Sequence, residues 1–109
     1  MINYARVLKQ KGWKLFILSN NFRERTKYYM ENFSFLSELF DKVYFSWQTG
    51  YVKPSEDSFT NVLRENNLDP QNCYYFDDSE KNVIAAKRLG INAHKYSGLK
   101  ETMSILEDT

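Results

Sequence analysis

The sequence predicts an α/β protein, with a Rossmann-like parallel sheet of about four strands flanked by helices in a single domain that spans residues 1–109. One observation behind this prediction is that the apolar runs at residues 15–18 and 73–76 are continuous rather than alternating, which is typical of strands covered on both faces. The other is that helix-like and strand-like segments alternate along the chain, as they do in parallel sheets built with right-handed crossovers.

The first half of the chain is expected to supply two helices and two strands. Tyr4, Val7 and Leu8 have helical spacing, and Gly12 ends the helix that contains them. The predicted segments are a helix at 3–11, a strand at 13–18, a helix at 23–33, a shorter apolar turn or helix at 35–40 and a strand at 42–47. The helix at 23–33 is expected to bury a stripe made of Thr26, Tyr29, Met30 and Phe33.

The second half continues the alternation. Pro54 suits the first turn of a helix, Ser79 can cap the helix that follows it, and Gly90 suits the end of that helix. The predicted segments are a loop at 49–54, a helix beginning at Pro54, a strand at 73–76, a helix at 80–89, a strand at 91–96 and a helix at 99–106. The strand at 91–96 has mixed polarity and is therefore expected at an edge of the sheet.

Composition excludes several classes of protein. At 109 residues with 42% hydrophobic residues, the chain can form one small core, and its net charge of +1 gives no electrostatic reason to bind nucleic acid or an anionic membrane. No apolar run approaches the roughly 18 residues of a transmembrane helix. The only cysteine, Cys73, lies in an apolar run and cannot form an internal disulfide, so we expect a buried thiol and a reducing, cytoplasmic location.

The most informative stretch places Asp77 and Asp78 directly after the strand at 73–76. Ligand sites in parallel sheets collect at the carboxyl ends of strands, and two adjacent carboxylates repel each other unless a cation neutralises them. Oxygen ligands of this kind suit Mg²⁺. The alternative is a solvated Asp-Asp-Ser turn that only caps a helix, and this stretch alone leaves both interpretations open.

Two further stretches end in polar groups. Ser19 and Asn20 follow the strand at 13–18, where a hydroxyl and an amide could donate to an anionic oxygen, although ordinary turn and N-cap chemistry is the simpler explanation when they are taken alone. Lys53 lies in a loop before Pro54 and could place its charge on a phosphate or between carboxylates. Taken alone, Lys53 is more simply interpreted as a solvated surface lysine.

In combination these stretches carry a family resemblance. Residues 15–21 (LFILSNN), 50–54 (GYVKP) and 75–83 (YFDDSEKNV) resemble the second, third and fourth motifs of the haloacid dehalogenase-like (HAD) hydrolase superfamily, in the right order. Residues 85–91 (AAKRLGI) are similar to the helix and turn that follow the fourth motif. The resemblance covers nearly the whole chain.

The resemblance implies Mg²⁺-dependent phosphoryl transfer through an aspartyl-phosphate, on a small phosphorylated metabolite. By motif position, Ser19 would bind the transferring phosphoryl group with help from Asn20, and Lys53 would neutralise its charge. Asp78 would be the preferred direct Mg²⁺ ligand, with Asp77 binding directly or through water. The acidic pair is typical of the phosphatase and phosphomutase branches of the superfamily.

One expected feature is missing. The superfamily's first motif, an Asp-x-Asp that carries the nucleophile, occurs nowhere in this sequence. We therefore expect a carboxyl-terminal portion of such a hydrolase, without the first strand and the cap, and inactive alone. The absent strand would leave two interior edges unpaired, so we predict either direct pairing of the strands at 15–18 and 74–76 or a second chain, by homodimerisation or strand swapping, in the gap.

Two other functions stay open at this point. One is a catalytically inactive binding module that retains a vestigial phosphate site. The other is a signalling receiver domain, which also combines acidic residues, a hydroxyl and a lysine. The order of the residues is unfavourable for a receiver domain, because the acidic pair Asp77–Asp78 comes late and after Lys53.

Overall fold

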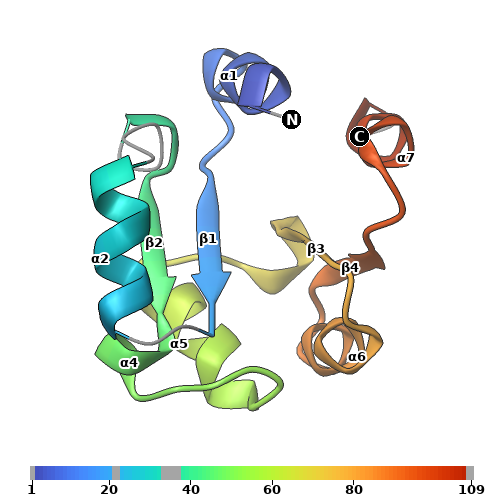
Figure 1. Cartoon of the computed structure of the whole chain (residues 1–109). Helices are drawn as coiled ribbons and strands as arrows, with labels where there is room; N and C mark the ends of the chain where they lie inside the picture. Colours follow the sequence, from blue (N-terminus) through green and yellow to red (C-terminus); the bar gives the residue numbers. More distant parts are fainter. Residues whose placement is uncertain (1, 21–22, 33–37, 108–109) are drawn as a thin grey trace. The chain divides into compact units, whose positions relative to one another are not determined.

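A computed structural model describes residues 2–20, 23–32 and 38–107 (Figure 1). The chain separates into two compact units, Met1–Val52 and Lys53–Thr109. The first contains α1 (Ile2–Gln10), β1 (Phe16–Ser19), α2 (Arg23–Asn32), β2 (Lys42–Phe45) and α4 (Ser46–Thr49). The second contains α5 (Glu56–Glu65), the 3₁₀ turn η1 (Pro70–Asn72), β3 (Tyr74–Asp77), α6 (Glu80–Arg88), β4 (Asn92–Lys95) and α7 (Leu99–Glu107). The predicted alternation of helices and strands is confirmed.

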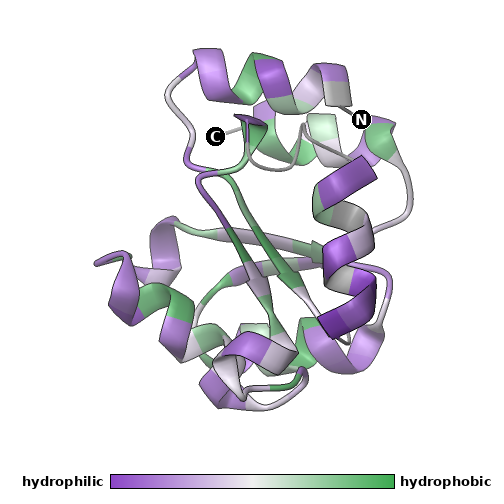
Figure 2. Cartoon of the chain, turned by 60° about the vertical axis from the view of Figure 1, so that its left-hand side comes forward, coloured by the Kyte–Doolittle hydropathy of each residue, from purple (hydrophilic) through white to green (hydrophobic). Residues whose placement is uncertain are grey.

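In the first unit, β1 and β2 pair in parallel, with Phe16 opposite Lys42 and Ser19 opposite Phe45. Asp41 joins the two strands at their start. Its backbone N–H donates to the Leu15 carbonyl at 2.7 Å, and its Oδ2 accepts from the Leu15 N–H at 2.6 Å. Figure 2 shows green, hydrophobic stretches along this strand pair. β1 is half-buried along its length, and β2 ends in two buried residues, Tyr44 and Phe45.

The buried stripe predicted for α2 is not observed at Met30, which is 41% exposed. The side chains of Thr26, Tyr29 and Phe33 lie outside the described part of the chain. Most of α2 is coloured as hydrophilic in Figure 2. The predicted burial is therefore wrong at Met30 and stays a prediction at the other three positions. Within the turn or helix predicted at 35–40, the described residues 38–39 are helical.

In the second unit, β3 and β4 pair in parallel, with Tyr74 opposite Asn92 and Asp77 opposite Lys95. Helix α6 packs against both strands. The buried core of this unit consists of Phe59, Val62, Val83, Ala85, Ala86, Ile91, Ala93 and Leu106. Helices α5 and α6 and strand β4 all contribute to this core. The loops before α5 and α6 therefore lead into helices that are held in place by packing.

The four strands form two parallel pairs, β1–β2 and β3–β4. Parallel strands with helices beside them confirm the predicted fold class. β1 and β3 belong to different units, so direct pairing between them, one of the two arrangements predicted for the missing strand, stays a prediction. The partner and register of a strand depend on tertiary contacts as well as on its apolar pattern. The sequence therefore does not show which of several similar apolar strands pair. Pairing with a second chain stays a prediction.

Within the described ranges, no helix combines the length and the apolar character needed to cross a bilayer.

Candidate functional site

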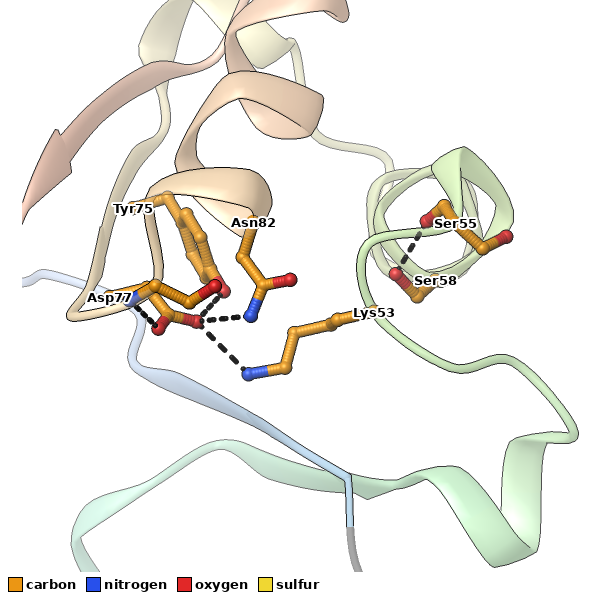
Figure 3. A network of polar contacts seen from close by, with 7 residues as sticks. Lys53, Ser55, Ser58, Tyr75, Asp77 and Asn82 are labelled. Carbon is orange, nitrogen blue, oxygen red and sulfur yellow. Dashed lines mark hydrogen bonds and ion pairs between the residues drawn. The ribbon is translucent and has the colours of Figure 1, made fainter.

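Asp77, the last residue of β3, accepts four hydrogen bonds through its carboxylate (Figure 3). Oδ2 accepts from the Tyr75 hydroxyl, from the Lys53 ammonium at 3.1 Å and from the Asn82 amide at 3.1 Å. Oδ1 accepts from the backbone N–H of Ser79 at 2.8 Å. A carboxylate offers about four lone-pair positions, so this one is nearly saturated with donors from within its own unit.

The local sequence explains two of these donors. Tyr75 lies two residues before Asp77 and therefore on the same face of β3. Asn82 lies in the first turn of α6, which begins three residues after Asp77. The short turn between strand and helix brings the start of α6 back over the strand end, where the helix dipole favours a negative charge.

Ser79 is the N-cap residue of α6, but its side chain makes no capping hydrogen bond. Ser79 is therefore the N-cap residue, as predicted, but the predicted hydrogen bond from its side chain is not formed. The Asp77 carboxylate binds the Ser79 N–H instead. A carboxylate is the stronger acceptor, because hydrogen bonds to charged groups are about twice as strong as neutral ones.

Lys53 reaches Asp77 from the loop before α5. Its side chain is 13% exposed and that of Asp77 is 10% exposed, so the ion pair lies mostly out of water. This burial contradicts the interpretation of Lys53 as a solvated surface lysine. Helix α5 begins at Glu56 rather than at Pro54, with Ser55 as an N-cap whose Oγ accepts from the Asp57 N–H at 3.2 Å.

A second contact stiffens the same loop. The Ser58 hydroxyl, on a residue that is 7% exposed, donates to the Ser55 carbonyl at 2.7 Å (Figure 3). The Lys53–Pro54 peptide bond is cis. The loop that carries the ammonium is thus tied to the first turn of a core helix.

Burial and hydrogen bonding act in opposite directions on Asp77. Desolvation alone would raise the pKa of the Asp77 carboxyl, but the donors Tyr75, the Ser79 N–H, Asn82 and Lys53 outweigh it and hold the pKa below its usual range. Burial, reinforced by the neighbouring Asp77 and Asp78, raises the pKa of the Tyr75 hydroxyl. Near neutral pH the pair is therefore an ionised carboxylate and a neutral phenol that donates to it.

Asp78 has a different environment. It lies in the bend after β3, its side chain is exposed, and it accepts none of the hydrogen bonds that converge on Asp77. Its oxygens are therefore available to an external ligand. In the part of the chain that the structure describes, no group of three or more His, Cys, Asp or Glu side chains could hold a metal ion. Asp77 and Asp78 could thus supply only part of a metal's ligands.

Ser19 and Asn20 belong to the other unit. Ser19 is the last residue of β1 and is half-buried, and Asn20 follows it and is exposed. Both lie at the carboxyl end of a parallel strand, as their position in the sequence predicted.

Two residues of the Asp77 cluster were missed by the sequence reasoning. Both Tyr75 and Asn82 lie in the fourth-motif stretch 75–83, but the resemblance implies no role for either. A signal did exist for Tyr75, because a hydroxyl two residues before a strand-end carboxylate shares its face. For Asn82 the turn geometry between β3 and α6 was needed.

Comparison with known proteins identifies the family. The sequence profile of the haloacid dehalogenase-like hydrolases matches residues 2–95. This chain belongs to that family. The stretches that resemble the second, third and fourth HAD motifs all lie within the matched residues, which make up most of the chain.

Individual HAD relatives are also similar. The D-ribitol-5-phosphate phosphatase of Bacteroides thetaiotaomicron is 31% identical over 55 residues, which are 50% of this chain and 27% of that protein. A predicted HAD-like hydrolase from Porphyromonas gingivalis has a TM-score of 0.88 and 28% identity, covering 99% of this chain and 57% of its own.

A wild-type HAD family enzyme from Bacteroides thetaiotaomicron, solved in complex with magnesium and inorganic phosphate, has a TM-score of 0.82 and 27% identity. That match covers 90% of this chain and 52% of the enzyme. The chain thus spans only about half the length of these structures, and about a quarter of the curated phosphatase.

Proposed function

We propose that this chain carries part of the active site of a Mg²⁺-dependent phosphatase or phosphomutase that acts on a small phosphorylated metabolite through an aspartyl-phosphate. The observation that carries the proposal is the nearly dehydrated Lys53–Asp77 ion pair at the carboxyl end of β3. Phosphoryl transfer depends mainly on positioning and charge neutralisation, and a positive charge held in a fixed place supplies both. The family match and the phosphatase and phosphate-bound relatives support this choice.

The two carboxylates divide the work in this proposal. Asp77 accepts three hydrogen bonds at Oδ2, so its role in this proposal is to hold the Lys53 ammonium. Only its Oδ1 would be accessible to a metal-bound water. Asp78 is exposed and offers its oxygens to the cation directly. These donors fit Mg²⁺, which takes one or two carboxylates and completes its shell with water and phosphate oxygens. When bound, Mg²⁺ would neutralise negative charge on the phosphoryl group.

Lys53 would donate from its ammonium to a phosphoryl oxygen while Asp77 keeps that ammonium in place. Ser19 and Asn20 would donate a hydroxyl and an amide hydrogen to phosphoryl oxygens, as the resemblance implies for the second motif. No residue of this sequence matches the nucleophilic Asp of the first motif. We therefore expect no turnover by this chain alone.

Calorimetric titration with inorganic phosphate, with and without Mg²⁺, tests the proposal. We expect phosphate binding that Mg²⁺ strengthens, that Lys53→Met weakens at all Mg²⁺ concentrations, and that loses its Mg²⁺ dependence in Asp78→Asn. Asp57→Asn, which changes an exposed carboxylate in the first turn of α5, is the matched control and should behave as wild type.

Two outcomes contradict the proposal. One is phosphate binding that ignores both Lys53→Met and Asp78→Asn. The other is tight binding of a protein partner without any dependence on phosphate or Mg²⁺, which would support a catalytically inactive binding module. Hydrolysis of a chromogenic phosphate ester by the chain alone, abolished by Asp78→Ala, would overturn the expected inactivity.

We also propose that a second chain supplies a strand to this sheet, by homodimerisation or strand swapping. The support is that each unit contains a parallel pair of strands, β1–β2 in one and β3–β4 in the other, and that the edge of such a pair can take a further strand. An unpaired interior strand edge leaves backbone groups without partners, at about 1–3 kcal/mol each. Analytical ultracentrifugation should show a dimer at micromolar concentration, and a strictly monomeric chain would contradict this.

A further inference from the structure

We propose that Tyr75 is a positioning residue, whose hydroxyl fixes the orientation of the Asp77 carboxylate and thereby the place of the Lys53 ammonium. The effect of Tyr75 on phosphate binding rests on the function proposed above. The hydrogen bond from Tyr75 to Asp77 does not depend on that function. Tyr75 opens the fourth-motif stretch 75–83, but the resemblance implies no role for it.

The three side chains that donate to Asp77 Oδ2 differ in rigidity. Lys53 reaches the oxygen through four flexible methylene groups, and Asn82 lies in the first turn of a helix. Tyr75 has only two side-chain torsions, and its ring packs edge-on against Phe59, with centroids 5.0 Å apart and an interplanar angle of 84°. Because Phe59 is 3% exposed, Tyr75 is the donor held by the core.

The same core contact lies close to Lys53 in the chain. Phe59 is on α5, and α5 begins three residues after Lys53. One packed pair of rings therefore anchors both the strand that carries Tyr75 and Asp77 and the helix whose leading loop carries the ammonium. Tyr75 and Lys53 approach one carboxylate oxygen from two elements that share this anchor (Figure 3).

The contact itself indicates a donor role, because the Tyr75 hydroxyl donates to Asp77 Oδ2. A tyrosine that only filled the core would need no carboxylate within hydrogen-bond distance of its hydroxyl.

The substitution Tyr75→Phe separates the two roles, because it keeps the ring and its contact with Phe59 and removes only the hydroxyl. Lysine ammonium signals in ¹⁵N nuclear magnetic resonance report how firmly Lys53 is held, with Lys53→Met giving the assignment. In Tyr75→Phe we expect the Lys53 ammonium protons to exchange with water about tenfold faster, the factor that corresponds to one lost hydrogen bond. Tyr96→Phe makes the same chemical change at a residue whose backbone N–H donates to the Asp77 carbonyl. The substitution keeps that backbone contact and should leave the Lys53 signal unchanged.

Unchanged Lys53 exchange in a folded Tyr75→Phe protein would overturn the proposal. The wild-type protein offers a second test that needs no variant, since a hydrogen-bonded Tyr75 hydroxyl proton should give a slowly exchanging signal with a cross-peak to Asp77. Absence of that signal would also overturn it.

Phosphate titrations of the same proteins separate this proposal from the proposed function. If the wild type binds inorganic phosphate, Tyr75→Phe should bind it several-fold more weakly, and equal binding would count against Tyr75. If the wild type does not bind phosphate, the proposed function fails, and the ammonium exchange still decides the role of Tyr75.

Discussion

The Lys53–Asp77 pair makes a sharp prediction about stability, because the first unit contains a natural control. Lys9 and Asp41 also form an ion pair, with a shorter N–O distance of 2.8 Å against 3.1 Å. Distance alone would make Lys9–Asp41 the stronger pair. Their side chains are 38% and 34% exposed, however, whereas those of Lys53 and Asp77 are 13% and 10% exposed. Burial therefore predicts the opposite order.

The magnitudes follow from the contacts. Lys53→Met removes one charge-assisted hydrogen bond and leaves Asp77 with three donors, so we expect a loss of about 1–2 kcal/mol in the free energy of unfolding. Asp77→Asn leaves a largely buried ammonium beside a neutral amide, and we expect a loss of about 3 kcal/mol. The coupling energy between the two changes should be about 1–2 kcal/mol. For Lys9→Met with Asp41→Asn it should be about 0.2–1 kcal/mol, as for exposed pairs.

Double-mutant cycles measured by amide hydrogen exchange test this order, because the strand amides of β1–β2 and β3–β4 report on the two units separately. The two pairs should also differ in salt dependence, with Lys9–Asp41 weakening more in 1 M salt. A Lys53–Asp77 coupling below about 0.5 kcal/mol, or one smaller than that of Lys9–Asp41, would refute the reasoning from burial.

Three further predictions concern stability. The pKa of Asp77 is depressed in the folded state, so its ionised form contributes stability that is present above the unfolded pKa of about 3.9 and lost as the pH falls towards the folded pKa. Asp77→Asn should therefore make stability less dependent on pH below about 4 in urea unfolding, and an unchanged dependence would count against the assigned pKa. Phe59→Ala should cost about 3–5 kcal/mol in the same assay, because a ring that is 3% exposed leaves a cavity and Tyr75 loses its packing partner, and a loss below 1 kcal/mol would contradict this. Gly50→Ala should cost about 1–2 kcal/mol although nothing lies within 4 Å of the added Cβ, since Gly50 has a φ of +78°, and a neutral effect would show that the loop relaxes.

The order and type of the elements could be predicted because they depend on local pattern. Continuous apolar residues in 15–18 and 73–76 indicated covered strands, and β1 and β3 lie there. Capping residues and glycines marked where helices end, so the bounds of α6 differ from those expected by one residue.

Pairing and burial could not be predicted in the same way. The sequence offered similar apolar strands, and only tertiary structure shows that β1 pairs with β2 and β3 with β4. Met30 has the spacing of a buried residue but is 41% exposed, because helical spacing defines a face without showing that anything covers it.

The candidate site was predictable in its charges and not in its geometry. Strand-end position and motif order pointed to Lys53, Asp77 and Asp78. The sequence did not show that Asp77 would be buried and Asp78 exposed, because two adjacent carboxylates look alike in the sequence. Asp77 accepts from Tyr75 and Asn82 and its side chain is nearly buried, whereas Asp78, one residue later, is exposed.

Paramagnetic broadening by Mn²⁺, used in place of Mg²⁺ with inorganic phosphate present, tests the central claim most directly. The account predicts that the backbone amide signals of Asp78 and Ser79 broaden at the lowest Mn²⁺ concentrations, that added Mg²⁺ reverses this, and that Asp78→Asn abolishes it. Broadening that spreads over exposed carboxylates such as Glu56 and Asp57 and spares Asp78 would contradict it.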